Sequence, residues 1–227
     1  MEQAPGYDCT WFVIPLFNEA TVIGEVVANL RKQYPLVVCV DDGSSDNSAE
    51  AAAAAGAVVV KHPYNMGQGA AIKTGIDYAL RDENMRQIVT FDADGQHQVD
   101  DAAGMIKTLN DKKVDVVLGS RFLDDRSNAS AIKRFVLKLA VGYTNLTTGM
   151  KLTDAHNGLR VFSRKSCELI SIEQNRMAHA SEIISEISRH QLSVEEYPVQ
   201  ILYTDYSRAK GQPLLNSVNI LIDLLFR

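Results

Sequence analysis

Short apolar runs alternate with amphipathic stretches along the first half of the chain. The runs predict strands, and the stretches between them, where apolar residues recur every three or four positions, predict helices. The predicted strands are Trp11–Ile14, Leu36–Val40, Ala57–Val60, Gln87–Phe91 and Asp115–Leu118, and the predicted helices are Glu19–Lys32, Asp46 or Ser48 to Ala55, Gly69–Leu80 and Asp100–Leu109. Apolar strands that alternate with helices indicate an α/β fold with a mainly parallel sheet covered on both faces.

The pattern changes after Gly119. The remaining segments predict helices over Ala131–Leu146 and Ser181–His190 and strands at Val161–Phe162 and Val194–Tyr203. The apolar stripe of Ala131–Leu146, and a second one over Leu214–Leu225, indicate packing against the core or a partner more often than contact with a membrane. No linker or repeat divides the sequence, which predicts one domain over residues 1–227.

Composition limits the function. The 227 residues carry a net charge of −5, and 46% of them are hydrophobic, which is ordinary for a globular protein with a sizeable core. The acidic balance argues against non-specific binding of nucleic acid. Cys9, Cys39 and Cys167 are an odd, widely spaced set, which favours a reducing compartment and argues against a disulfide framework or a structural zinc site.

The sequence shows no targeting or membrane-spanning pattern. It has no run of roughly 18 apolar residues and no basic start followed by an apolar stretch. We therefore expect a cytoplasmic protein, either soluble or peripheral on the membrane.

Acidic residues follow two of the predicted strands. Asp41 and Asp42 come directly after Leu36–Val40, where open α/β sheets bind ligands and where a carboxylate can accept hydrogen bonds from a base or a ribose. Helix capping explains Asp46 or Ser48 in the same stretch but does not require both preceding aspartates. The stretch alone indicates either a capping turn or a nucleoside site.

Asp92 and Asp94 follow the strand Gln87–Phe91. Two carboxylates one residue apart in extended chain project the same way, and they repel each other unless a cation lies between them. Such oxygen ligands suit Mg²⁺ or Mn²⁺, and Gln96 and His97 are near enough in sequence to complete a coordination shell. The two acidic strand ends together predict metal-assisted chemistry on a diphosphate.

Other motifs carry less weight. Gly67-Gln68-Gly69 lacks the third glycine of a dinucleotide-binding loop, because Ile72 stands there, and a tight turn is the better interpretation. Arg121 and Arg208 are basic points of a kind that is usually solvated surface. No nucleophile elbow indicates a hydrolase.

Five motifs occur in order along the chain: Phe12-Val-Ile-Pro-Leu-Phe-Asn-Glu19, Val40-Asp-Asp-Gly-Ser-Ser-Asp46, Asn65-Met-Gly-Gln-Gly-Ala70, Phe91-Asp-Ala-Asp-Gly-Gln-His97 and Gly119-Ser-Arg-Phe122. Together they resemble family 2 glycosyltransferases, nearest to the dolichol-phosphate mannosyltransferase and polyprenyl-phosphate glycosyltransferase branch. The resemblance covers residues 11–213. It implies a GT-A fold, a UDP- or GDP-linked hexose as donor, inversion at the anomeric carbon, and Mg²⁺ or Mn²⁺ as cofactor.

The resemblance also implies roles for individual residues. Residues 8–122 would form the nucleotide-sugar-binding half, and residues 123–227 would form the acceptor half with the amphipathic helices. Asp42 would face the base, Arg121 would lie near the acceptor or the sugar, and Arg208 would close onto the diphosphate. The metal would be bound by Asp94, Gln96 and Asp92. The full set for the nucleotide sugar is Pro15, Phe17, Glu19, Val40, Asp42, Asp92, Ala93, Asp94 and Arg208.

The sequence departs from the branch pattern at several positions. Phe17 stands where tyrosine is common, Gln68 replaces a frequent lysine, and Asn157 and Leu159 replace serine and phenylalanine in the stretch Thr153–Arg160. This stretch is expected to shape the acceptor pocket, with Arg160 either binding phosphate or buried for structural reasons.

The acceptor decides whether the reaction needs a base. A polyprenyl phosphate is an anion at neutral pH and can attack without one, whereas a sugar hydroxyl needs a carboxylate to take its proton. Glu182 lies where hydroxyl-acceptor relatives keep that base, although we favour a first-turn glutamate stabilised by the helix dipole. We therefore predict hexose transfer to a polyprenyl phosphate at the cytoplasmic membrane face.

Three alternatives stay open. Transfer to a hydroxyl of a glycan or lipid-linked oligosaccharide would use Glu182 as base. A non-catalytic nucleotide-sugar-binding protein would share the fold, and a nicotinamide-dependent enzyme is a distant third. Without a spanning helix, attachment to a membrane would need surface helices or a small membrane partner protein. A homo-oligomer is the other partner that we consider.

Overall fold

The computed structural model describes residues 6–123, 141–142, 144–176 and 178–202. Its strands form one seven-stranded sheet in the order β3-β2-β1-β4-β6-β5-β7. Neighbouring strands pair in parallel except at β6, which runs antiparallel to β4 and β5. The strands are β1 (Thr10–Leu16), β2 (Leu36–Asp41), β3 (Val58–Lys61), β4 (Gln87–Thr90), β5 (Val116–Ser120), β6 (Arg160–Ser163) and β7 (Val194–Pro198). The mixed, mainly parallel sheet confirms the predicted fold class.

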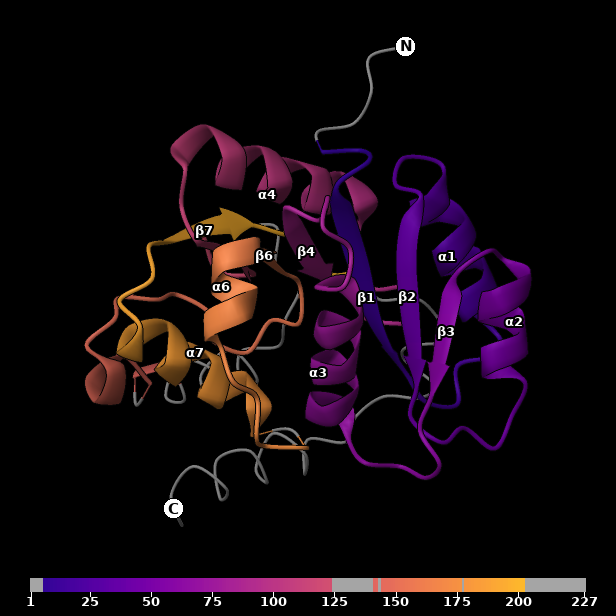
Figure 1. Cartoon of the computed structure of the whole chain (residues 1–227). Helices are drawn as coiled ribbons and strands as arrows, with labels where there is room; N and C mark the ends of the chain where they lie inside the picture. Colours follow the sequence, from indigo (N-terminus) through magenta and orange to yellow (C-terminus); the bar gives the residue numbers. More distant parts are fainter. Residues whose placement is uncertain (1–5, 124–140, 143, 177, 203–227) are drawn as a thin grey trace.

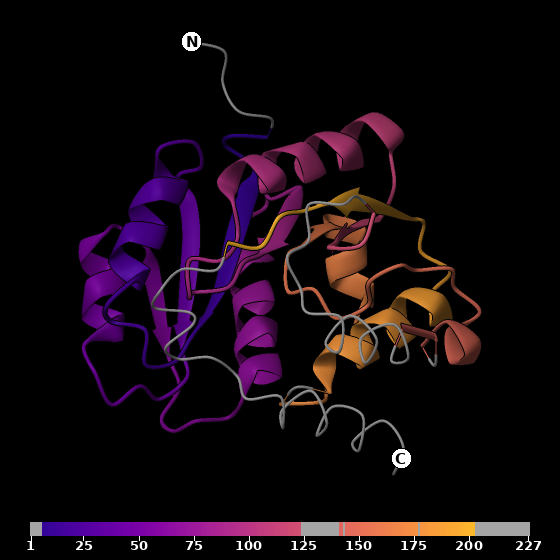
Figure 2. The ribbon, with the colours of Figure 1, turned by 180° about the vertical axis from the view of Figure 1, so that it is seen from behind.

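Helices cover both faces of the sheet (Figures 1 and 2). One face carries α1 (Ile23–Arg31), α2 (Ser48–Ala54) and α4 (Val99–Lys112), and the other carries α3 (Gln68–Ala79), α6 (Arg164–Leu169) and α7 (His179–Arg189). Side chains alternate along each strand, so Phe12 and Ile14 pack under α1 and α4, whereas Trp11 and Val13 pack under α3 and α7. Two buried faces explain why the strands read as nearly continuous apolar runs.

Most predicted elements differ from the structure by one to three residues at an end, and two differ by more. The helix predicted from Glu19 begins only at Ile23, because residues 20–22 form a turn and Val22, with a φ of −122°, lies outside the helical region. Side chains of the 44–48 loop bind the backbone N–H groups of residues 18, 19 and 20 and hold this turn. The strand predicted over Val194–Tyr203 ends at Pro198, opposite Ser120, where its partner β5 also ends.

The short helix α6 was not predicted. Only Ser166 and Cys167 of its six residues are buried, so it leaves no periodic apolar signal. The side chain of Ser163 accepts a hydrogen bond from the Ser166 N–H and caps the helix, and that serine is the one sequence signal that marks its start.

Part of the chain lies outside the described residues. Of the predicted helix Ala131–Leu146, only residues 141, 142 and 144–146 are described, and these are helical. The apolar stripe Leu214–Leu225 lies outside them altogether. Among the helices that are described, none is long and apolar enough to cross a membrane.

The sheet brings the motifs to one edge. In Figure 1 the arrowheads of β1, β2 and β3 point to the same, lower edge, and the loops that follow them carry the first three motifs.

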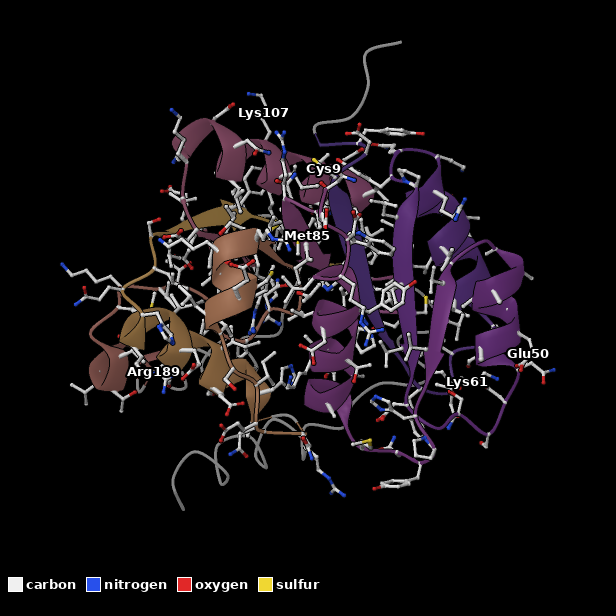
Figure 3. All side chains as sticks on the ribbon, in the orientation of Figure 1. Cys9, Glu50, Lys61, Met85, Lys107 and Arg189 are labelled. Atoms are coloured by element: carbon white, nitrogen blue, oxygen red, sulfur yellow. The ribbon has the colours of Figure 1, made fainter. Side chains whose placement is uncertain are left out.

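The outer strand β3 ends in Lys61, which pairs at 3.0 Å with Glu50 of α2 on the surface (Figure 3). A charged residue on an edge strand disfavours pairing with another chain.

Candidate active site

The loops after β1 and β2 are bound to each other at the carboxyl edge of the sheet. The N–H of Asn18 donates to Ser44 Oγ at 3.0 Å, and the N–H of Glu19 donates to Ser48 Oγ at 2.7 Å. Asn18 adopts a positive φ of 55°, which turns the chain sharply after the strand. Phe17 is left 44% exposed at this edge, where its ring can contact a ligand.

The other residues predicted to frame a nucleoside are less accessible. The side chain of Val40 is fully buried in the core, and Ala93 is 5% exposed, so a ligand would meet their backbone. Pro15 is half-buried and lies opposite Val40 in the β1–β2 ladder. A nucleoside contact at these three residues stays a prediction.

Asp42 is a buried carboxylate that organises the turn before α3. Its Oδ1 accepts from the Met66 N–H at 2.8 Å and pairs with Nδ1 of His62 at 2.7 Å, and its Oδ2 accepts from the Gly67 N–H at 2.7 Å. Three of its roughly four lone-pair positions are thereby occupied. The predicted contact with a base is untested, and the structure shows in addition a local role that the sequence did not indicate.

Asp92 lies at the end of β4 with a well-defined set of neighbours. Its Oδ2 pairs with Nε2 of His97 at 2.9 Å, and its Oδ1 lies 3.4 Å from Nε2 of Gln68. A Cβ at Gly158 would come within 2.6 Å of the carboxylate, so a larger residue there would displace the Asp92 side chain. Burial acts to raise the pKa of Asp92, but the charge and hydrogen bond of His97 outweigh it and leave this pKa below its ordinary value.

His97 orients Asp92. Sequence reasoning placed it as a further metal ligand, but its side chain is 3% exposed and its Nε2 is used by the carboxylate. Its ring also packs edge-on against Phe91. This pairing fixes the direction of Asp92.

Asp94 carries an electrostatic conflict. Burial, and then the neighbouring Asp92 and Glu19 carboxylates, raise the pKa of Asp94 to about 6, although the Gln96 backbone N–H donates to its Oδ1 at 3.1 Å. A bound cation would relieve this conflict. Within the described residues, no three His, Cys, Asp or Glu side chains lie close enough together to hold a metal ion by themselves. Asp92 and Asp94 nevertheless fit Mg²⁺ or Mn²⁺, which commonly combine one or two carboxylates with substrate phosphates.

Arg121 is bound to Asp154. Its Nε and Nη2 donate to the two carboxylate oxygens of Asp154 at 2.6 and 2.9 Å, and its backbone N–H donates as well. Next to this pair, Glu196 accepts from the N–H groups of Thr153 and Asp154. Burial acts to raise the pKa of Asp154. The charge of the Arg121 guanidinium and the hydrogen bonds that Asp154 accepts from Arg121 and from the His156 N–H outweigh burial and lower this pKa. The predicted role of Arg121 near the acceptor is untested.

Arg160 lies beneath the site. It is 4% exposed, and its guanidinium donates to the carbonyls of Ala155, Asn157 and Ala180. Burial lowers its pKa to about 10. Of the two roles expected for this residue, the buried structural one agrees with its contacts.

The Gly67-Gln68-Gly69 turn packs against the segment before α7. The carbonyl of Asn175 accepts from the Gly69 and Ala70 N–H groups at 2.8 and 3.4 Å. In a dinucleotide-binding loop these N–H groups at the start of the helix would bind a pyrophosphate. They are already used here, which argues against the nicotinamide-dependent alternative.

A Gly69→Ala substitution should destabilise the protein by about 1–3 kcal/mol, since overpacking of a tight contact forces the backbone to shift. A Cβ there would lie 2.0 Å from the Gln174 carbonyl oxygen and 2.9 Å from Cβ of His179. Urea unfolding measures the loss. The control is Gly24→Ala in α1, where a Cβ meets only the Ala51 oxygen at 3.8 Å and stability should not fall. Equal stability of the two variants would contradict the close contact.

His179, in the first turn of α7, should make stability pH-dependent. Burial and the nearby Arg160 lower the pKa of this imidazole to about 4, from an ordinary 6.5. Between pH 6.5 and pH 4 the unfolded chain therefore binds a proton that the folded chain does not. As the pH is lowered through this range, the free energy of unfolding should decrease by up to about 3 kcal/mol.

A His179→Asn variant tests this, because Asn can still donate to the Arg176 carbonyl that Nδ1 of His179 contacts at 2.8 Å. Urea unfolding at pH 7, 6 and 5 should show a flatter dependence in the variant. An identical slope in both proteins would exclude His179 as the source.

Glu182 and Arg208 complete the predicted set. The carboxylate of Glu182 accepts hydrogen bonds from the backbone N–H groups of Glu173 and Gln174. Arg208 lies outside the described residues.

The sequence that builds this edge matches a known family. Residues 11–170 match the family model described as glycosyl transferase family 2. The chain belongs to this family. The glycosyltransferase is therefore an enzyme that transfers sugars, which confirms the predicted reaction class and removes the non-catalytic alternative.

Curated relatives extend over nearly the whole chain. The glycosyltransferase is 35% identical to an uncharacterized protein of Methanocaldococcus jannaschii, over 97% of this chain and 92% of that protein. It is 31% identical to the UDP-N-acetylglucosamine–dolichyl-phosphate N-acetylglucosaminyltransferase of Methanococcus voltae, over 95% of this chain and 94% of that protein. The relative from Methanococcus voltae, named for dolichyl phosphate, supports the polyprenyl-phosphate branch of the family.

Solved structures confirm the predicted GT-A fold. Glucosyl-3-phosphoglycerate synthase from Mycobacterium tuberculosis, crystallised with Mn²⁺, UDP and glucosyl-3-phosphoglycerate, matches with a TM-score of 0.73. The match covers 97% of this chain and 81% of the synthase at 15% identity. At that identity the likeness concerns the fold.

Proposed function

We propose that this glycosyltransferase moves a hexose, with inversion, from a nucleotide diphosphate sugar to a polyprenyl phosphate. The observation that carries the donor half is the Asp92–Asp94 pair, in which one carboxyl pKa is raised by burial and by its acidic neighbours. The relative from Methanococcus voltae, named for a UDP-sugar and dolichyl phosphate, supports the choice of substrates.

On the donor side, Asp94, Asp92 and Gln96 would bind a Mg²⁺ or Mn²⁺ ion together with the diphosphate. When bound, the ion stabilises the negative charge of the departing nucleoside diphosphate. His97 directs Asp92 toward this position by its 2.9 Å hydrogen bond. Arg208 would add a second positive charge to the diphosphate.

On the acceptor side, a phosphate monoester needs no general base, because it is already an anion at neutral pH. Glu182, the candidate base for a hydroxyl acceptor, already accepts two backbone hydrogen bonds. This supports the lipid phosphate over the sugar hydroxyl. The proposal includes peripheral attachment at the cytoplasmic membrane face, through surface helices or a partner protein.

The test is transfer by the purified protein with Mn²⁺ from UDP-N-acetylglucosamine, UDP-glucose or GDP-mannose, each offered with a polyprenyl phosphate. We expect a glycosylated lipid and one equivalent of nucleoside diphosphate with one of these donors. The matched control is the dephosphorylated polyprenol, which should give no product. Transfer to an oligosaccharide hydroxyl with none to the lipid phosphate would overturn the acceptor assignment.

A further inference from the structure

Glu182 contacts a loop through its carboxylate. Its Oε2 accepts from the backbone N–H of Glu173 at 3.1 Å and from that of Gln174 at 2.9 Å. Residues 173–176, called the 173–176 segment below, precede α7, and Glu182 lies in the first turn of that helix. One oxygen of the carboxylate is thus held by two main-chain donors.

The 173–176 segment binds the start of α3. The Asn175 carbonyl accepts from the Gly69 N–H at 2.8 Å, and a Cβ at Gly67 would lie only 2.2 Å from the same oxygen. Nδ1 of His179 donates to the Arg176 carbonyl and fixes the other end of the segment to α7. Figures 1 and 2 agree that α7 and the lower end of α3 lie side by side.

The start of α3 reaches the acidic pair at β4. Gln68, the first residue of α3, places its Nε2 3.4 Å from Oδ1 of Asp92. On the opposite side of the turn, Asp42 accepts from the Gly67 N–H at 2.7 Å. The turn is therefore fixed from two sides, by Asp42 and by the 173–176 segment.

We propose that Glu182 is a positioning residue. It binds the 173–176 segment, the segment fixes the N-terminus of α3, and α3 sets Gln68 beside Asp92. Glu182 takes no proton from the acceptor, so the acceptor must ionise without it, as a phosphate does. The inference rests on the proposed function in treating Asp92 as part of the donor site.

Conservative and non-conservative variants separate positioning from base catalysis. Glu182→Gln keeps an oxygen that can accept both N–H groups, and its kcat and KM for the donor should stay within about threefold of wild type. Glu182→Ala releases the segment, and kcat/KM for the donor should fall about tenfold or more, because small displacements at a site are costly. A general base would instead lose about 100-fold or more in kcat in Glu182→Gln, together with one limb of the pH profile. That result would overturn the inference.

Glu186 provides the matched control. It lies one turn further along α7 and accepts from the Ser171 N–H at 3.2 Å, outside the 173–176 segment. Glu186→Ala should leave kcat/KM for the donor within about twofold of wild type. If kcat/KM for the donor fell as much in Glu186→Ala as in Glu182→Ala, general destabilisation of α7 would explain both losses, and the inference would be overturned.

Hydrogen exchange tests the same inference by a measurement that does not depend on enzyme activity. The amides of Gly69 and Ala70, which donate to Asn175, should exchange about tenfold faster or more in Glu182→Ala and at the wild-type rate in Glu182→Gln. Unchanged exchange in Glu182→Ala would overturn the positioning role. Failure of the wild type to glycosylate any polyprenyl phosphate would refute the proposed function and leave this measurement standing.

Discussion

An Asp94→Asn variant is expected to lose hexose transfer by on the order of 1,000-fold or more while keeping a stable fold. The charge of Asp94 is unfavourable unless a cation balances it, since burial and Asp92 raise its pKa to about 6. An amide removes this repulsion, so the free energy of unfolding should stay equal or rise. The same amide offers a cation no charge, so the leaving diphosphate loses its stabilisation.

The measurements are kcat with Mn²⁺ and urea unfolding of the same preparations. The matched control is Asp77→Asn in α3, an exposed carboxylate that pairs with Lys73 at 2.7 Å on the surface. It should change neither quantity appreciably, because surface ion pairs contribute little. Transfer by Asp94→Asn at more than about a tenth of the wild-type rate would mean that the cation is bound elsewhere.

The largest loss of stability is expected from Asp154→Ala, at about 3–5 kcal/mol, or a fall in Tm of about 10 °C. The carboxylate is fully buried and binds both Nε and Nη2 of Arg121. It also accepts from the His156 N–H at 3.1 Å. Removing it takes away the carboxylate that binds both Nε and Nη2 of the Arg121 guanidinium, which is only 17% exposed, and weaker compensation of that largely desolvated charge dominates the cost.

A double variant separates the charge from the packing. Asp154→Ala combined with Arg121→Met also removes the cation that Asp154 binds, and should recover part of the stability that Asp154→Ala loses. Urea unfolding of the wild type, both single variants and the double variant gives the coupling energy. Additive effects in this cycle, or a loss below about 1 kcal/mol in Asp154→Ala, would show that the pair contributes no more than a surface ion pair.

The sequence by itself determined that the chain forms a mainly parallel sheet covered by helices, and the edge of that sheet at which the motifs gather. Strands buried on both faces must be apolar at nearly every position, and the helices between them must show one apolar face, so both leave a local pattern. The carboxyl ends of parallel strands share one edge of the sheet. The sequence alone therefore predicts that Asp42 and Asp92, which follow two such strands, lie at the same edge.

The tertiary structure alone decided what the polar side chains bind. Its place after a strand marked Asp42 as a candidate, and the family resemblance marked Arg121 and Glu182, but neither could show whether each one meets solvent, a ligand or the backbone of a distant segment. Glu182 binds N–H groups eight and nine residues earlier, and Arg121 binds Asp154, 33 residues away.

Sheet order was also decided only in three dimensions. β6 follows β5 in the chain, yet it lies between β4 and β5 and runs antiparallel to both. Its placement brings Gly158, just ahead of β6, against the Asp92 carboxylate. Such contacts depend on which surfaces meet after the chain has collapsed, and a contact between distant residues leaves no periodic trace in a single sequence.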